Sequence, residues 1–115
     1  MTNQFTADIQ QLIDAVLTTP GDSAASLRRV VEARAAASGG RTIDIDKLDA
    51  ELTAEVGSYV DKIALHAYKI TDADIDAIRK AGFSEDSLFE ITLSAALGAG
   101  IARLERGLQA VRGER

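Results

Sequence analysis

The apolar residues of this chain recur mostly at intervals of three and four positions, which is the spacing of one face of an α-helix. Near the N-terminus Ile9, Leu12 and Val16 follow this spacing and predict a first helix over about residues 7–18. The same pattern predicts a second helix over about residues 24–37. We therefore expect the first part of the chain to form a pair of helices.

Residues that favour helix ends flank both of these segments. Thr6 is the expected N-cap of the first helix, and Pro20 is expected to end it. Asp22 or Ser23 is the expected N-cap of the second helix, and Gly39-Gly40 marks its end because glycine accepts the left-handed conformation.

Three arginines on the second helix, Arg28, Arg29 and Arg34, have two interpretations. They form either an anion-binding patch or an ordinary solvated helix face. The solvated face is favoured, since Glu32 stands among them and mixed charges of this kind are typical of a surface. We therefore expect all three side chains to face water.

Two groups of closely spaced aspartates raise the question of a metal site. The first follows an expected linker at residues 41–45, and the second opens a later helix; the groups are Asp44, Asp46 and Asp49, and Asp72, Asp74 and Asp76. Neither group has the glycine that a calcium-binding loop needs at its sixth position. Carboxylates near the positive end of a helix dipole explain both groups, so no metal and no other cofactor is predicted.

The third helix is expected to be long, over about residues 47–69. An apolar stripe runs along it and consists of Leu52, Val56, Val60, Ile63 and Ala67. Beside it runs a second stripe of titratable side chains, called here the polar stripe, which consists of Glu55, Tyr59, Lys62 and His66. At about 100° per residue, this polar stripe borders the apolar stripe, whereas Asp61 is expected to point to solvent.

The fourth and fifth helices have the clearest end signals in the chain. Thr71 is the expected N-cap of the fourth helix, and Gly82 is expected to end it. Ser84 is the expected N-cap of the fifth helix, which covers about residues 85–111. The middle of this helix, residues 91–102, is uncharged and rich in small residues, so we expect it to be buried on several sides and against a second subunit.

Composition and charge limit the classes of protein that fit. At 115 residues the chain is expected to be one domain, with an N-terminal helical pair and linker at 1–45 and a helical core at 46–112. A net charge of −5 disfavours nucleic-acid binding. No run of about 18 apolar residues is present and the N-terminus lacks the features of a signal peptide, so a cytoplasmic protein without a membrane span is predicted.

The run from Tyr59 to Leu108 resembles the carboxymuconolactone decarboxylase and alkylhydroperoxidase D superfamily. The resemblance covers a little under half of the chain. Its matching features are the long helix ending in His66, the acidic turn Thr71-Asp72-Ala73-Asp74, the corner Ala81-Gly82-Phe83-Ser84-Glu85-Asp86, the run Phe89-Glu90-Ile91-Thr92 and the small-residue helix. It implies an all-α scaffold of about five helices, in which the third and fifth pack antiparallel, and self-assembly as a trimer or hexamer.

The peroxidase branch of that superfamily carries Cys-x-x-Cys-x-x-x-His on the long helix. With His66 aligned to the motif's histidine, Tyr59 and Lys62 stand where the two cysteines would be. The chain has no cysteine at all, so it cannot supply the thiolate and resolving thiol of that reaction. Peroxidase activity by this route is excluded.

Three hypotheses stay open. The favoured one is a non-catalytic helical oligomer that retains the family scaffold and has a binding or structural role. The alternative is a cysteine-independent lyase or isomerase acting on a small acidic ligand, in which His66 is the acid or base, Lys62 holds a carboxylate, Tyr59 donates a proton and Glu55 orients the imidazole. The third is an unrelated helical bundle. Whether the protein is an enzyme is not decided by the sequence.

Overall fold

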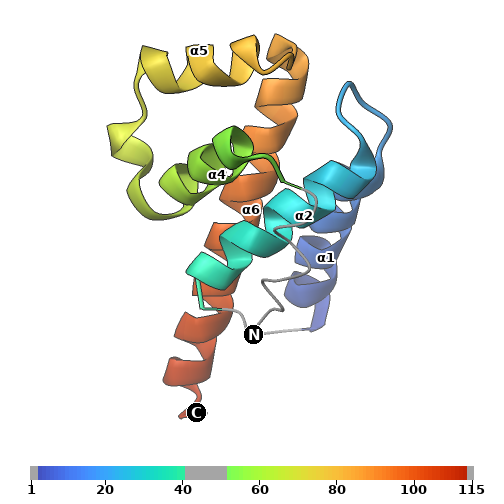
Figure 1. Cartoon of the computed structure of the whole chain (residues 1–115). Helices are drawn as coiled ribbons and strands as arrows, with labels where there is room; N and C mark the ends of the chain where they lie inside the picture. The colour runs from blue at the N-terminus through green and yellow to red at the C-terminus, as the bar shows by residue number, and fades with distance from the viewer. Residues whose placement is uncertain (1–2, 41–51, 114–115) are drawn as a thin grey trace.

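The computed structural model describes residues 3–40 and 52–113, and every regular element within these ranges is helical (Figure 1). In chain order the elements are α1 (Asn3–Thr18), α2 (Ala25–Ser38), α4 (Ala54–His66), the 3₁₀ turn η1 (Ala67–Lys69), α5 (Asp72–Lys80) and α6 (Glu85–Val111). The predicted all-α class is confirmed. Outside the described residues lie the expected linker at 41–45 and the aspartates Asp44, Asp46 and Asp49.

Helix α6 is unbroken over 27 residues, as predicted, and its most extensive packing is against α2. At Gly98 the two backbones nearly touch, because a Cβ atom built there would lie 2.2 Å from the carbonyl oxygen of Glu32. Only glycine fits at this point. The close contact therefore explains a residue that disfavours a helix interior by about 1 kcal/mol relative to alanine.

The small-residue middle of α6 is buried on one side of the helix only. Ser94, Ala95 and Gly98 are buried, whereas Ala96 and Gly100 on the other side are exposed. Within a single chain, the expectation of burial on several sides is therefore wrong for the outward face of α6. The covered side faces α2 and α4.

The core is built from aliphatic side chains of four helices. The largest apolar side chains that are fully buried have at most 1% of their surface exposed and are Val31, Val56, Val60, Ile78 and Ile91. Each such burial contributes about 1.5–3 kcal/mol relative to an exposed side chain. The apolar stripe predicted on the third helix supplies Val56 and Val60, so that part of the sequence pattern is confirmed.

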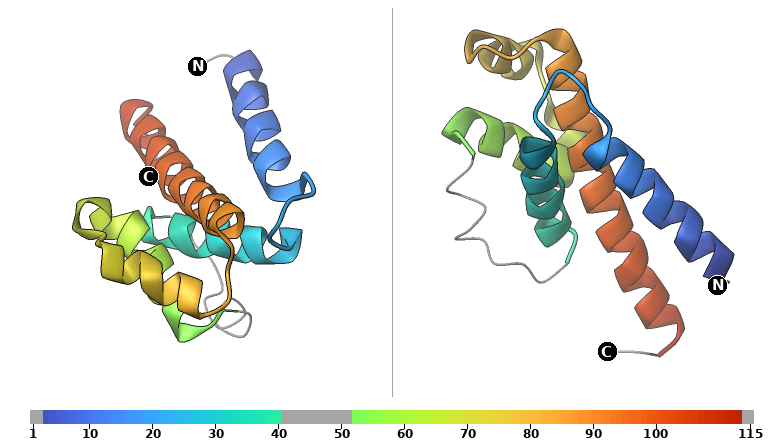
Figure 2. Two further views of the ribbon diagram at one scale, coloured as in Figure 1. Left: turned by 90° about the horizontal axis from the view of Figure 1, so that it is seen from above. Right: turned by 90° about the vertical axis from the view of Figure 1, so that its right-hand side faces the viewer.

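Helix α4 crosses α6 steeply instead of lying along it, as the views from the front and from above both show (Figures 1 and 2). The expected antiparallel packing along their lengths is therefore not found. At the crossing, a guanidinium nitrogen of Arg103 on α6 donates to the carbonyl oxygen of Ala64 near the end of α4. Helix α5 forms the expected short connection between α4 and α6.

The corner between α5 and α6 follows its end signals closely. The Thr71 side chain accepts a hydrogen bond from the Asp74 backbone N–H, and the Asp74 carboxylate accepts one from the Thr71 N–H, which completes a capping box. Gly82 has a φ of 103°, a conformation that only glycine adopts without strain. The Ser84 side chain then accepts from the Ser87 N–H and starts α6.

Three predicted helix boundaries are wrong. Helix α1 begins at Asn3, so Thr6 lies inside it and is not its N-cap. Helix α4 begins at Ala54, after an N-cap at Thr53 whose side chain accepts from the Val56 N–H, and not near Lys47. The N-cap position of α2 is Ala24, without a side-chain cap of its own.

The cap expected from Asp22 or Ser23 is replaced by a contact from far along the chain. The carboxylate of Glu90 on α6 accepts from the Asp22 N–H at 2.9 Å and from the Ser23 N–H at 2.7 Å, and it also accepts from the Ser23 hydroxyl. These donors, first those of Ser23, hold the pKa of Glu90 below its usual value. The loop between α1 and α2 is therefore fixed by α6.

The solvated interpretation of the three arginines is correct only for Arg29, which is exposed. Arg28 is 3% exposed, and its guanidinium donates to the carbonyl oxygens of Val16 and, at 2.6 Å, Thr19. It therefore caps the C-terminal end of α1 from α2. A cation can serve there because the last carbonyls of a helix have no partner within the helix.

Arg34 is half-buried and forms a two-pronged ion pair with Asp61 on α4, with both nitrogen–oxygen distances at 2.8 Å. The prediction that Asp61 points to solvent is wrong. The pair ties α2 to α4 beside Gly57, where the guanidinium would lie 3.2 Å from an added Cβ atom.

Candidate functional site

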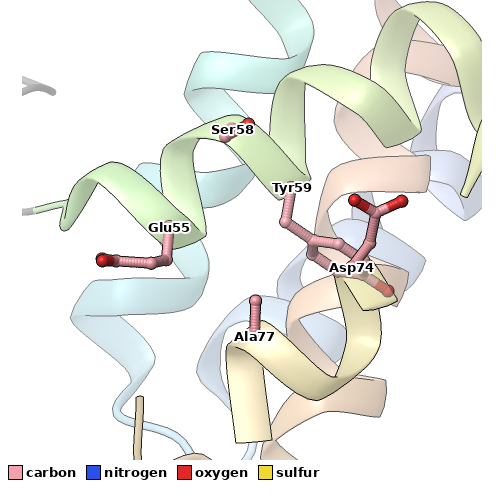
Figure 3. Close-up of a pocket in the computed structure, with 5 residues that line it drawn as sticks. All are labelled: Glu55, Ser58, Tyr59, Asp74 and Ala77. Carbon is pink, nitrogen blue, oxygen red and sulfur yellow. The ribbon is translucent and has the colours of Figure 1, made fainter. Parts of the chain in front are cut away.

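The predicted polar stripe leads to a cleft between α4 and α5. The cleft has a volume of about 220 Å³, and its lining residues are Glu55, Ser58, Tyr59, Asp74 and Ala77 (Figure 3). Helix α4 contributes the first three and α5 the last two. The cleft exists because the 3₁₀ turn η1 reverses the chain and lays α5 across the polar side of α4.

Tyr59 is committed to a structural hydrogen bond. Its ring is buried, and its hydroxyl lies 2.8 Å from the hydroxyl of Thr92 on α6. Since the Thr92 hydroxyl donates its own proton to the carbonyl oxygen of Leu88 at 2.7 Å, it can only accept from Tyr59. The single proton of Tyr59 is therefore already used, and the role of proton donor to a ligand is not open to it in this conformation.

Lys62 is likewise committed to a neighbour. Its ammonium group lies 2.8 Å from a carboxylate oxygen of Asp74, with about a third of the lysine side chain exposed (33%). The same carboxylate accepts from the Thr71 N–H at 2.8 Å as part of the capping box. The hydrogen bond from Lys62, followed by that from Thr71, lowers the pKa of Asp74. Asp74 is thus ionised and neutralises the lysine.

His66 lies at the end of α4 and is exposed. Its ring meets the exposed ring of Tyr68 edge to face, with centroids 6.1 Å apart, and the ammonium of Lys69 lies 5.8 Å from the centre of the same tyrosine ring. His66 is not one of the residues that line the cleft. A histidine in this position cannot act on a molecule bound beside Tyr59 without rearrangement.

The structure therefore divides the polar stripe into three parts. Glu55 and Tyr59 line the cleft, Lys62 reaches it only through Asp74, and His66 lies outside it. Figure 3 also shows the carboxylate of Glu55 extending away from Tyr59, so Glu55 does not orient any other member of the stripe. The division arises because the stripe extends over about three turns of helix, whereas the lining residues on α4 extend only from Glu55 to Tyr59.

Sequence reasoning missed two polar residues that line the cleft, Asp74 and Ser58. Asp74 was assigned only to the cap of the fourth helix, although a capping carboxylate has acceptor capacity left for a second donor. The available signal was the pair of Lys62 and Asp74 on two helices joined by a short turn. Ser58 gave no signal, since an isolated serine on a helix has no particular chemistry.

The charges around the cleft do not match the acidic ligand expected from the sequence. The carboxylates of Glu55 and Asp74 line it, and the nearby cation of Lys62 is already paired. A carboxylate ligand would have to displace Asp74 from Lys62 or meet two negative charges. The acidic ligand stays a prediction that the lining of the cleft does not favour.

Within residues 3–40 and 52–113, no three histidine, cysteine, aspartate or glutamate side chains are grouped so that they could hold a metal ion. Asp72 and Asp74 lie in the first turn of α5 instead, and a carboxylate oxygen of Asp76 lies 3.5 Å from a guanidinium nitrogen of Arg79.

In the described part of the chain, α6 is the one helix long and apolar enough to cross a bilayer by length and composition, contrary to the apolar-run estimate. In its most apolar stretch 44% of the residues are buried against the other helices. The core helix of a globular protein meets the same criteria, so this is weak evidence for a membrane span. The cytoplasmic location stays a prediction.

No protein-family model matches this chain, and comparison with curated proteins finds no match. The resemblance carried by residues 59–108 therefore rests on the residues themselves.

Proposed function

We propose that this protein is a cysteine-free helical oligomer on a carboxymuconolactone decarboxylase-like scaffold, with a binding or structural role in place of catalysis. The observation that carries the proposal is the separation of the polar stripe. Tyr59, the proton donor, is hydrogen-bonded to Thr92, and Lys62, the cation, is bonded to Asp74. His66 lies outside the cleft.

The scaffold part of the proposal is supported by the corner between α5 and α6, and not by the steep crossing of α4 and α6, which departs from the antiparallel packing that the resemblance implies. Gly82 and Ser84 of this corner occupy the positions that the resemblance assigns to them, and they form the expected turn and cap. The oligomeric part is supported by the apolar outward side of α6, where Phe89 and Val111 are 66% and 85% exposed. Large apolar side chains exposed along one helix are typical of an interface.

Two measurements test this proposal. Light scattering at micromolar concentration is expected to give a mass of two or more chains, and a monomer would contradict the oligomer. Assays with a panel of lactones and keto acids are expected to show no turnover above buffer. Turnover that is lost in His66→Gln and retained in the neighbouring Tyr68→Phe would contradict the non-catalytic role.

A second candidate function, a lyase or isomerase that works without a thiol, would use the cleft beside Glu55 and Asp74, and it requires a rearrangement because these two carboxylates disfavour an acidic substrate. In that case Asp74 would release Lys62 on substrate binding, and the freed ammonium would hold the carboxylate of the substrate. Asp74→Asn would then raise turnover or lower KM, because the asparagine no longer neutralises Lys62. A variant with neither turnover nor ligand-induced stabilisation would remove this candidate.

A further inference from the structure

The outward side of α6 carries an apolar strip, of which Leu93 and Leu104 are half-buried and the other members are exposed. At about 100° per residue, its members fall within an arc of about 80°. We call this set the outer strip; it consists of Phe89, Leu93, Ala96, Gly100, Leu104, Gly107 and Val111. None of these residues is charged.

Five of the seven residues of the strip are exposed in the single chain. Phe89 and Val111 are 66% and 85% exposed. A Cβ atom added at Gly100 or Gly107 would meet nothing within 4 Å, in contrast to Gly98 on the inward side. Helix propensity alone would therefore favour alanine at both outward glycines, so their presence calls for a contact outside the chain.

The order of large and small residues along the strip complements itself when one copy is reversed about Gly100. Leu93 then lies opposite Gly107, Ala96 opposite Leu104, and Phe89 opposite Val111. Each large aliphatic side chain near the centre meets a small one, and two glycines meet at the centre. A parallel alignment would instead place leucine against leucine and glycine against glycine.

The charges at the two ends of α6 favour the same reversed alignment. Its first turn carries Glu85 and Asp86, whereas its last three turns carry Arg103 and Arg106 against the single acid Glu105, and Arg112 follows at the C-cap. Reversal brings the acidic end of each copy toward the basic end of the other, and it also opposes the two helix dipoles favourably. A parallel pair would bring like charges together.

We propose that the outer strip is the contact between two copies of this chain, which pack α6 against α6 in antiparallel orientation around a two-fold axis at Gly100. The inference deepens the proposed function, on which it rests, by naming the surface and the symmetry of assembly. A two-fold contact of this kind requires one patch to complement itself, and the outer strip meets that requirement.

Cysteine cross-linking tests the contact cleanly, because the natural chain has no cysteine. Gly100→Cys places one thiol on the proposed axis, and Gln109→Cys places one on the exposed opposite side of the same helix, about 180° away. Under copper–phenanthroline oxidation at 10 µM chain, Gly100→Cys is expected to form a disulfide-linked dimer at least ten times faster than Gln109→Cys.

A second pair of variants tests the direction of the helices. In the antiparallel contact, Leu93→Cys mixed with Gly107→Cys is expected to cross-link, whereas Leu93→Cys alone is not, since its two copies lie about 21 Å apart along the axis. A parallel pair would give the reverse result and would overturn the proposal. Circular dichroism of each variant checks that the helices are intact.

A charged side chain at the centre provides an independent test that needs no cross-link. Gly100→Arg adds its side chain into open space in one chain, so the fold is expected to persist while the mass measured by light scattering falls to that of a monomer. Gln109→Arg, the matched control, is expected to keep the mass of the natural chain.

The outcomes separate this inference from the proposed function. A monomeric natural chain would overturn both, including the case of a monomer that binds lipid vesicles through α6. An oligomeric natural chain in which Gly100→Cys cross-links no faster than Gln109→Cys, or in which Gly100→Arg keeps its mass, would overturn the outer-strip contact alone. Rapid cross-linking at Gly100 with loss of assembly in Gly100→Arg would support it.

Discussion

The two halves of this molecule fix their helix ends in different ways. In the second half, the ends of α5 and α6 are set by neighbours in sequence, since Thr71 and Ser84 cap the helices that follow them and Gly82 makes the turn. In the first half, the end of α1 is capped by Arg28, and the loop before α2 is held by Glu90, which stands 67 residues beyond Ser23.

The helix ends of the second half could form in a short peptide, whereas those of the first half exist only in the folded chain. A local cap survives in any conformation that keeps the turn, whereas the contacts of Arg28 and Glu90 require α1, α2 and α6 to be in place together. We therefore expect the first half to lose its order first when the packing of α6 is disturbed.

The largest loss of stability is expected at the contact between Gly98 and Glu32, which joins the two halves. In Gly98→Leu the side chain would collide with the backbone of Glu32, where even a Cβ atom comes within 2.2 Å. Because backbone must move, we expect a loss of more than about 3 kcal/mol in the free energy of unfolding, measured in urea. Gln109→Leu, at an exposed position of the same helix outside the outer strip, should instead change it by less than about 0.5 kcal/mol. Equal effects would mean that α2 and α6 do not meet closely.

The second-largest loss of stability is expected when the buried guanidinium of Arg28 is removed. Arg28→Met removes the donors to Val16 and Thr19 while keeping most of the side-chain volume, and it is expected to lower stability by about 2–3 kcal/mol. Arg29→Met, one position along and exposed, should change it by less than about 0.5 kcal/mol. Hydrogen exchange should speed up mainly in α1. Similar results for both variants would indicate that Arg28 faces water.

The Glu90 contact predicts a dependence on pH. The pKa of Glu90 is lower in the folded chain than its usual 4.5, so its carboxylate contributes stability that is fully present above pH 4.5 and is lost as the pH falls through the folded value. Glu90→Gln should lower stability near pH 7 by about 1–2 kcal/mol and flatten the decline below pH 4.5. Unfolding curves from pH 3 to pH 7 check this, and parallel declines for both proteins would contradict it.

The smallest effect is expected at a local cap. Ser84→Ala removes the acceptor for the Ser87 N–H and should lower stability by about 1 kcal/mol, with the order of α1 and α2 retained. Ser26→Ala, at an exposed position of α2, is the control and should change little. A loss of α1 protection in Ser84→Ala would weaken the distinction between the two halves, because Ser84 also donates to Asp22 at 3.2 Å.

The fold could be predicted to the extent that its signals are local. Spacing of apolar residues located the five α-helices found within residues 3–40 and 52–113, and cap and glycine signals located the ends of α5 and the start of α6. Spacing could not place the start of α4, because the apolar stripe continues to Leu52, before the cap at Thr53. Nor could it show that Arg28 is buried, since nothing in its neighbourhood differs from that of Arg29.

For the candidate site, the sequence located the right helix but not the right grouping. The polar stripe is real as a line of side chains, and two of its members, Glu55 and Tyr59, line the cleft. The hydrogen-bond partners of Tyr59 and Lys62 are Thr92 and Asp74, which belong to other helices. Spacing along a single helix contains no information about such partners.

The meeting of Gly98 with Glu32 has a consequence for how this chain can change over time. Two rods that touch backbone to backbone at one point cannot slide past each other by a turn, because a bulkier residue would arrive at the crossing. Distant descendants of this sequence would therefore be free to exchange most aliphatic positions and surface charges while retaining a glycine at that crossing. A single conserved glycine within a long and otherwise variable helix would therefore identify homologues of this chain.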